Sequence, residues 1–420
     1  MARIMPAMDR PSALYEQLTS RPLPPGFPRH AILPDYDGLS IARIPDLVFA
    51  ALGLDAPSGR LREVVSPPRV DRVLLAIFDG LGYNRLGEIA DAERDVHALA
   101  TSGMCIPVTT VFPSTTVAAL TTYSTGLAPS EHGMLGYRLY LREISAIVNM
   151  IQFSVVGGRT ETPLPDTFPA SSLFTCPTVY EQLGAHDVET HALLPRGIAD
   201  SGLSRVLYRG ATHIQPAIGL SDMLALARQI LNKARTPTVV TLYWPGLDSI
   251  AHPRGPQSDA YAAEAASVAA AVRREIVGRV EPTLLLVSSD HGFATMRPSD
   301  YVPTSRIPEL RDAPLFFPVG EPRASYLFLR PERREDVLAS APTVCEGDIV
   351  LVGAREALSL GLFGSRVSHP EALSRLGDLL AVSTGARGLL HPYPDAPLLQ
   401  GMHGGLTADE MIVPLIVDSL

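Results

Sequence analysis

The stretch RVLLAIFDG, residues 72–80, decides the fold of this chain. It is a short apolar run rich in strand-forming residues, and it ends at Asp79-Gly80. A continuous apolar run of this length is typical of a strand that is buried on both faces of a sheet. Asp79 therefore stands at the carboxyl end of a predicted buried strand. Because Asp-Gly is also a common turn dipeptide, Asp79 taken alone can equally be a turn residue.

Three further apolar runs have the same character. They are TVVTLYW at 238–244, TLLLVSSDHG at 283–292 and MIVPLIVD at 411–418. Helical patterns lie between these runs, at 115–125, 222–233 and 259–277. Near-continuous apolar strands separated by helices predict an α/β fold, with a mostly parallel central sheet and helices on both faces.

The chain is predicted to consist of an N-terminal extension and one large domain. Residues 1–68 are rich in proline and are expected to wrap around the core. The α/β domain covers 69–420. Its pattern is interrupted at 138–220 and at 296–399, where prolines, glycines and short strand-like runs indicate inserted smaller subdomains.

Composition excludes several classes of protein. The net charge of −9 argues against a nucleic-acid polymer as partner, because proteins that bind nucleic acids are basic. Three widely spaced cysteines form neither a disulfide framework nor a paired-cysteine metal site, and they fit a reducing compartment. The chain shows no signal-peptide pattern and no apolar run near the ~18 residues of a membrane span. We expect a cytoplasmic protein with no membrane partner, and the sequence is silent on oligomeric state.

Carboxylates and imidazoles gather where the predicted strands begin or end. The first is Asp79, at the end of RVLLAIFDG. The others are Asp248 and His252 in YWPGLDSIAHPRG, Asp290 and His291 in VSSDHG, and His403 in GMHGG. Ligands of open parallel sheets bind outside the carboxyl ends of the strands, so these side chains can converge. Mixed nitrogen and oxygen donors favour Zn²⁺ over Mg²⁺ or Ca²⁺. Taken singly, Asp248 can be a helix cap and the two loop histidines can be surface residues.

Two adjacent threonines begin a predicted helix in VFPSTTVAALTTYSTGLAPSEHG, residues 111–133. A threonine at a helix start is usually a cap, whose hydroxyl accepts a hydrogen bond from an unpaired N–H group. The same place favours an anion, because the N–H groups and the helix dipole point at it. Thr115 and Thr116 are therefore open to two interpretations, a cap or a nucleophile that attacks phosphorus.

The order of these motifs resembles the alkaline phosphatase superfamily, and most of all its type I phosphodiesterase/nucleotide pyrophosphatase branch. The motifs are Asp79, FPSTT with STGLAPSEHG, GLDSIAH, SDHG and MHGG. The resemblance implies an alkaline-phosphatase-like fold, two metal ions, generally Zn²⁺, and a threonine or serine nucleophile. It implies that one ion is held by Asp79, Thr116, Asp290 and His291, and the other by Asp248, His252 and His403.

The resemblance also selects between the two threonines. In the family, the nucleophile stands nine residues before the threonine of a Thr-Gly pair that ends the helix. Thr125-Gly126 is that pair here, and nine residues back is Thr116. The resemblance thus implies Thr116 as nucleophile and Thr115 as cap or neighbour, with His132 as a structural residue that closes the following turn.

Two positions depart from the branch. The branch usually has a threonine before Phe-Pro, where this chain has Val111. It also has an asparagine after its Ser-His-Gly motif that helps to hold the phosphate, where this chain has Tyr137. Tyr137 can donate its O–H to a phosphate oxygen, and Arg138 can pair with one. Both residues can equally serve packing or lie on the surface.

The resemblance implies a metal-dependent hydrolase of phosphodiester or phosphoanhydride bonds that acts on a small phosphorylated substrate. The alternatives are a phosphomonoesterase or phosphonate hydrolase of the same superfamily and, from a different class, a non-catalytic binding module. We expect the diesterase because no Arg or Lys lies between Arg94 and Arg138 to neutralise a dianionic phosphoryl group beside Thr116.

Overall fold

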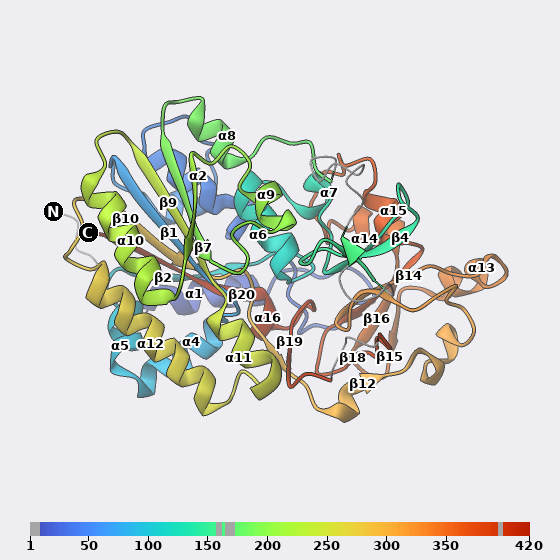
Figure 1. The fold of residues 1–420 in the computed structure, drawn as a ribbon. Helices are drawn as coiled ribbons and strands as arrows, with labels where there is room; N and C mark the ends of the chain where they lie inside the picture. Colours follow the sequence, from blue (N-terminus) through green and yellow to red (C-terminus); the bar gives the residue numbers. More distant parts are fainter. Residues whose placement is uncertain (1–8, 157–161, 164–172, 394–397) are drawn as a thin grey trace.

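The computed structural model describes residues 9–156, 162–163, 173–393 and 398–420 (Figure 1). Its centre is a seven-stranded sheet with the order β2-β20-β10-β1-β9-β7-β8. The strands are β1 Arg72–Phe78, β2 Met104–Thr109, β7 Glu189–Pro195, β8 His213–Ala217, β9 Thr238–Trp244, β10 Leu284–Ser288 and β20 Ile412–Ser419. Strand β20 runs antiparallel to both of its neighbours, whereas the other pairings are parallel. The four predicted strands and the mostly parallel sheet are confirmed.

The surroundings of β1 explain why every residue after Arg72 in this strand is apolar. Val73, Leu75 and Ile77 belong to the core on one face of the sheet. Leu74, Ala76 and Phe78 belong to the core on the other face. Because helices cover both faces, neither set of alternating side chains can be polar.

Helices pack on both faces of the sheet, as expected. One core includes residues of α4 Tyr83–Ala92, α5 Arg94–Ala100, α10 Leu220–Lys233, α11 Gly246–Arg254 and α12 Asp259–Glu275. The other includes residues of α2 Ile44–Ala51, α6 Thr116–Thr125, α8 Val179–Gly184 and α9 Gly202–Leu207. Short helices α3 Arg60–Val64, α7 Pro129–His132 and α16 Ala408–Met411 lie in the connections. None of the helices in the described ranges is both long and apolar enough to cross a membrane.

The first described residues pack against the large domain. This segment contains α1 Asp9–Thr19 and the 3₁₀ turn η1 Ile41–Arg43. The backbone N–H of Ile32 donates to the carbonyl of Leu406 at 2.8 Å, and that of Thr109 donates to Leu39 at 2.8 Å. The segment therefore lies along β2 and the loop that precedes α16.

Two smaller sheets stand beside the central one (Figure 1). One has the order β3-β4-β5-β6, with β3 Arg138–Leu141, β4 Ala146–Asn149, β5 Ser154–Val155 and β6 Thr162–Pro163. The other has the order β13-β14-β17-β16-β15, with β13 Val319–Glu321, β14 Ala324–Leu327, β15 Thr343–Cys345, β16 Ile349–Gly353 and β17 Leu379–Ser383. Helices α13 Pro331–Ser340, α14 Ala354–Ser359 and α15 Ala372–Leu376 accompany it. Two-stranded pairs join β11 Ala294–Thr295 to β19 Gly401–Met402 and β12 Tyr301–Val302 to β18 Gly388–Leu389.

The two ranges predicted as insertions differ in what they build. Most of 296–399 belongs to the five-stranded sheet and its surroundings. Within 138–220, the first strands form the four-stranded sheet, whereas β7 and β8 extend the central sheet. These two strands were not predicted from the sequence. The boundaries drawn at 68, 138–220 and 296–399 stay predictions.

A buried ion pair connects the five-stranded sheet to the segment before β20. The guanidinium of Arg323 donates two hydrogen bonds to the carboxylate of Glu410, at 2.6 and 2.7 Å, and both side chains are fully buried. Glu410 also accepts from the backbone N–H of Gly405 at 2.8 Å. The pair thus holds the loop that follows His403.

We expect Arg323→Ala to lower the free energy of unfolding by about 3–5 kcal/mol, because it leaves the Glu410 charge buried without its partner. Urea denaturation at a fixed metal concentration measures this. Arg334→Ala is the control, since Arg334 is half exposed and pairs with Asp378 at the surface at 3.0 Å; its loss should cost less than about 1 kcal/mol. Equal effects of the two substitutions would contradict the assignment of the buried pair.

Candidate metal centre

The polar residues predicted to converge lie together at the end of the central sheet where its parallel strands finish. Asp79 follows β1, Asp290 and His291 follow β10, Asp248 and His252 lie on α11 after β9, and Thr116 begins α6 after β2. His403 instead precedes a strand. Because β20 is antiparallel to β10, the residues that precede β20 lie at the same end of the sheet as the carboxyl ends of the parallel strands.

Four of these residues form a first group around His291. Its Nε2 lies 3.2 Å from Oγ1 of Thr116 and 3.4 Å from Oδ1 of Asp79. The same atom lies 3.5 Å from Oδ2 of Asp290. Ligands at about 2.0–2.1 Å from a tetrahedral Zn²⁺ are separated by about 3.3 Å, so these spacings suit a shared ion.

The other three residues form a second group around Asp248. Its Oδ1 lies 3.2 Å from Nε2 of His252 and 3.8 Å from Nε2 of His403. The rings of His403 and His291 are stacked with their centroids 3.8 Å apart, which joins the two groups. Three protein donors leave a fourth position open, as in zinc sites that act on substrates.

Each aspartate directs one oxygen toward the centre without a hydrogen-bond partner among the described residues. These oxygens are Oδ1 of Asp79, Oδ1 of Asp248 and Oδ2 of Asp290. By contrast, the other oxygen of Asp79 accepts from the Tyr243 hydroxyl, and that of Asp290 accepts from the backbone N–H of Gly80 at 3.1 Å. Unpartnered buried carboxylate oxygens are costly, so this set fits cations as their partners.

The three imidazoles are oriented by backbone carbonyls. Nδ1 of His252 lies 2.9 Å from the carbonyl of Gly401, and Nδ1 of His291 lies 3.1 Å from that of Gly292. Nδ1 of His403 lies 3.0 Å from the carbonyl of Ser114. A proton on each Nδ1 leaves the Nε2 lone pair facing the centre, which is the usual arrangement of metal-bound histidines.

Burial opposes the charged forms of Asp79 and His403, whereas Asp248 and His252 favour each other's charged forms. Against the effect of burial, the charge of His252 lowers the pKa of Asp248, and the charge of Asp248 raises the pKa of His252. Burial raises the pKa of Asp79 well above its usual range, and the nearby charges of Asp248 and Asp290 raise it further. Burial lowers the pKa of His403 well below its usual range, and His291 lowers it further. Divalent cations would relieve the repulsion among the carboxylates and would require neutral imidazoles.

The nucleophile candidates occupy distinct places. Helix α6 begins at Thr116, and Thr115 takes the extended N-cap position without a side-chain capping bond. The hydroxyl of Thr116 therefore faces His291 rather than capping the helix. Ser114 ties this helix start to the loop of His403, because its Oγ donates to the carbonyl of Gly405 at 2.9 Å.

A cavity of about 330 Å³ adjoins the second group. Its lining comprises Thr115, Thr116, Tyr137, Arg138, Ile151, Asp248, His252, Glu321, Pro322, Leu399, Met402 and His403. Arg138 is buried, with its guanidinium 4.7 Å from the ring centroids of both Tyr137 and Tyr393. The Tyr137 hydroxyl accepts a hydrogen bond from Asn149 at 2.9 Å. Both residues singled out in the sequence thus line the cavity, and Arg138 is not a surface residue.

A further acidic residue at the site, Glu321, was not predicted from the sequence; it ends β13 and is 2% exposed. Its Oε2 lies 3.3 Å from Nδ1 of His403. Burial raises its pKa well above the usual range, while a hydrogen bond with Thr115 and the charge of Arg138 act in the opposite direction. Its only signal in the sequence is a lone acidic residue inside the apolar run FFPVGEPRASYLF.

Comparison with known proteins places this chain in a family. The model of the type I phosphodiesterase / nucleotide pyrophosphatase family matches residues 73–383, about three quarters of the chain. The chain belongs to this family. It is therefore a hydrolase, its resemblance to the alkaline phosphatase superfamily is confirmed, and its relatives in the family are metal-dependent.

Solved structures agree with this fold. Murine ectonucleotide pyrophosphatase / phosphodiesterase 5, an inactive threonine-to-alanine variant with AMP, superposes with a TM-score of 0.63 at 16% identity, covering 83% of this chain and 87% of that chain. The human protein gives the same four values. Phosphonoacetate hydrolase from Sinorhizobium meliloti 1021, in complex with phosphonoformate, superposes with a TM-score of 0.59 at 17% identity. The match covers 82% of this chain and 89% of that chain. No curated protein sequence matches the chain.

We expect Asp79→Asn to stabilise the chelated, metal-free protein by about 1–2 kcal/mol at pH 7. The raised pKa of Asp79 means that its ionisation favours the unfolded chain at a pH above the ordinary aspartate value, and asparagine removes this penalty. The gain should disappear below about pH 4, where aspartate is protonated in both states. Urea denaturation in the presence of chelator measures it, and a substitution that destabilises equally at both pH values would contradict the electrostatic argument.

Proposed function

We propose that the chain is a metal-dependent hydrolase of phosphodiester or phosphoanhydride bonds in small phosphorylated molecules. Thr116 is its nucleophile, and two divalent ions, Zn²⁺ by preference, are its cofactors. The observation that carries the proposal is the set of three unpartnered aspartate oxygens, each at ligand spacing from an oriented imidazole among the described residues. A cytoplasmic location and the absence of nucleic-acid and membrane partners stay predictions.

Two sets of donors support two ions among the described residues: the donor atoms of Asp79, Asp290 and His291 lie within 4.8 Å of one another, as do those of Asp248, His291 and His403. The division of the ligands between the ions follows the family resemblance. Asp79, Thr116, Asp290 and His291 would hold one ion, and Asp248, His252 and His403 the other. When bound, such a pair acidifies a hydroxyl and stabilises charge on the attacking and leaving oxygens. A non-catalytic binding module has no need for a hydroxyl 3.2 Å from His291 beside the carboxylates, and this favours the enzyme.

Thr116 is well placed for attack on phosphorus. It is the first residue of α6, where unpaired backbone N–H groups stabilise the equatorial oxygens of a phosphoryl group. Its Oγ forms the new bond to phosphorus as the bond to the leaving oxygen breaks. Water then cleaves the phosphothreonine ester and restores the hydroxyl. The murine relative, whose threonine-to-alanine variant is inactive, supports this role by analogy.

The cavity is suited to the rest of the substrate. Arg138 and Tyr137 line it together with the apolar side chains of Ile151, Leu399 and Met402. Similar structures hold AMP and phosphonoformate, which are small phosphorus-containing ligands. Two divalent ions would exceed the charge of the three aspartates by about one elementary charge, which suits a singly charged diester.

One observation favours the alternative, a phosphomonoesterase or phosphonate hydrolase. Arg138 lies in the cavity wall, so it can add a positive charge for a dianionic group. The neighbouring Glu321 opposes this effect wherever it is ionised, since its carboxyl lies near the guanidinium.

We expect Thr116→Ala to lower kcat by at least about 10³-fold while bound metal is largely retained, because the other donors remain. Thr115→Ala is the matched control and should keep substantial activity, since its hydroxyl faces Glu321 rather than His291. Steady-state kinetics with a chromogenic diester, together with elemental analysis, test both. If the two variants behave the other way round, Thr115 is the nucleophile.

The kcat/KM ratio for bis-(p-nitrophenyl) phosphate over p-nitrophenyl phosphate should exceed one at matched pH and metal. Arg138→Ala should raise this ratio further, because the lost charge matters more to a dianion than to a monoanion. A ratio well below one in the wild type would assign the alternative function.

A further inference from the structure

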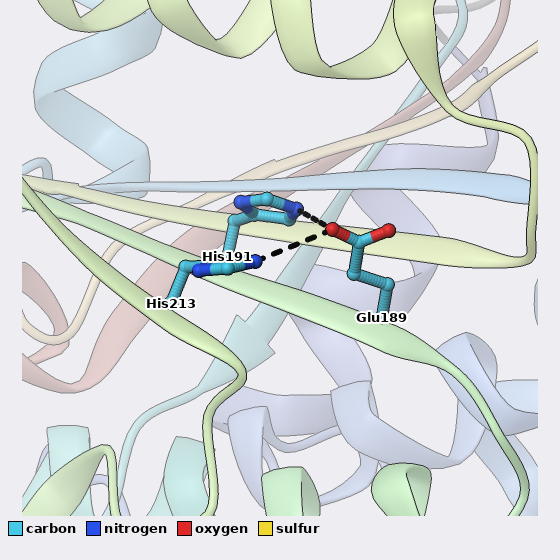
Figure 2. A group of neighbouring side chains, drawn as sticks. All are labelled: Glu189, His191 and His213. Carbon is cyan, nitrogen blue, oxygen red and sulfur yellow. Dashed lines mark hydrogen bonds and ion pairs between the residues drawn. The ribbon is translucent and has the colours of Figure 1, made fainter.

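A second group of side chains that can ligate a metal consists of Glu189, His191 and His213, and Figure 2 shows how they point toward one another. Glu189 and His191 stand at the start of β7, and His213 is the first residue of β8. Since both strands are parallel to β9 and β1, their starts lie at the end of the sheet away from Asp79. The group is therefore separate from the candidate metal centre.

Strand register brings the three side chains together. His191 and His213 are direct partners in the parallel pairing of β7 with β8. Glu189 precedes His191 by two residues, so the two side chains share one face of the sheet. Regular backbone structure, and not a loop conformation, thus positions all three donors.

The donor atoms have the spacing of ligands on a common ion. Oε1 of Glu189 lies 3.1 Å from Nε2 of His191 and 3.4 Å from Nε2 of His213. The centroids of the two imidazole rings lie 4.7 Å apart, and the ring planes are tilted by 31°. These spacings bracket the separation of about 3.3 Å between ligands of a tetrahedral Zn²⁺.

The group is open to solvent on one side. His191 is buried, whereas the side chain of His213 is 48% exposed and that of Glu189 is 38% exposed. An ion can reach the group directly from water. Burial lowers the pKa of His191, which favours the neutral imidazole that metals require.

We propose that Glu189, His191 and His213 bind a divalent transition-metal ion, Zn²⁺ by preference, with a fourth position occupied by water. Two imidazoles and one carboxylate are a known zinc ligand set. The ion would join β8, the edge strand of the sheet, to β7 and so stabilise the edge. Nδ1 of His191 has no hydrogen-bond partner among the described residues, so binding should be weaker than at a centre with oriented imidazoles.

The test counts bound Zn²⁺ per chain by equilibrium dialysis of chelated full-length protein and elemental analysis. The variants are His213→Ala and Glu189→Gln, and the control is His186→Ala, an exposed histidine outside the group. We expect each variant to bind one ion fewer than the wild type and the control to match the wild type. Diester hydrolysis should be unchanged in all of them.

This count separates the inference from the proposed function. The difference between wild type and variants reports on the group at the sheet edge, whereas the ions that the variants retain report on the candidate centre. Equal counts in wild type and both variants would overturn the inference and leave an ion-free cluster in which Glu189 accepts hydrogen bonds from both imidazoles. Loss of ions from the control as well would also overturn it.

We further expect added Zn²⁺ to raise the thermal midpoint of the wild type more than that of His213→Ala, because an ion that binds only the folded chain stabilises it. A rise common to both proteins belongs to other sites, so only the difference counts. The absence of any difference at saturating Zn²⁺ would contradict the role of the ion at the sheet edge.

Discussion

The rest of the site depends on one constraint: three buried aspartates at the strand ends of the central sheet each have one oxygen without a hydrogen-bond partner among the described residues. Taking carboxylates out of water is costly unless each oxygen finds a partner. Among the described residues, Tyr243 and the backbone N–H of Gly80 satisfy the outer oxygens of Asp79 and Asp290, and the inner oxygens are left facing the imidazoles. The topology brings these side chains together, because β1 lies between β9 and β10 and β20 runs antiparallel to β10.

The smaller sheets complete the site rather than merely covering it. The four-stranded sheet begins at Arg138, and the five-stranded sheet supplies Glu321, which contacts His403 from behind. The buried pair of Arg323 and Glu410 anchors this second sheet to the loop after His403. In the proposed function, the walls that the added sheets provide would set substrate specificity, and the residues at the strand ends of the central sheet would carry the chemistry.

The sequence predicted those parts of the molecule that have a local physical signature. Strands β1, β9, β10 and β20 consist mostly of apolar residues because they are covered on both faces. The aspartates follow within a few residues of the ends of β1, β9 and β10, and His403 lies in the segment before β20. Strand β8 was missed because it is short, mostly exposed and contains Pro216, and β7 was missed because its first half, Glu189 to His191, is polar. Glu321 was missed because its closeness to His403 arises from tertiary packing across 82 residues, which no local pattern records. The family match confirms the fold and the hydrolase class.

The central claim is that the unpartnered oxygens are metal ligands, and anomalous diffraction at the zinc absorption edge tests it most directly. Crystals grown with Zn²⁺ should show two anomalous peaks at this end of the sheet. One should lie within about 2.3 Å of Asp79 Oδ1, Asp290 Oδ2 and His291 Nε2, and the other equally close to Asp248 Oδ1, His252 Nε2 and His403 Nε2. The absence of a peak beside the aspartates, with their inner oxygens paired to protein or water protons instead, would contradict the account.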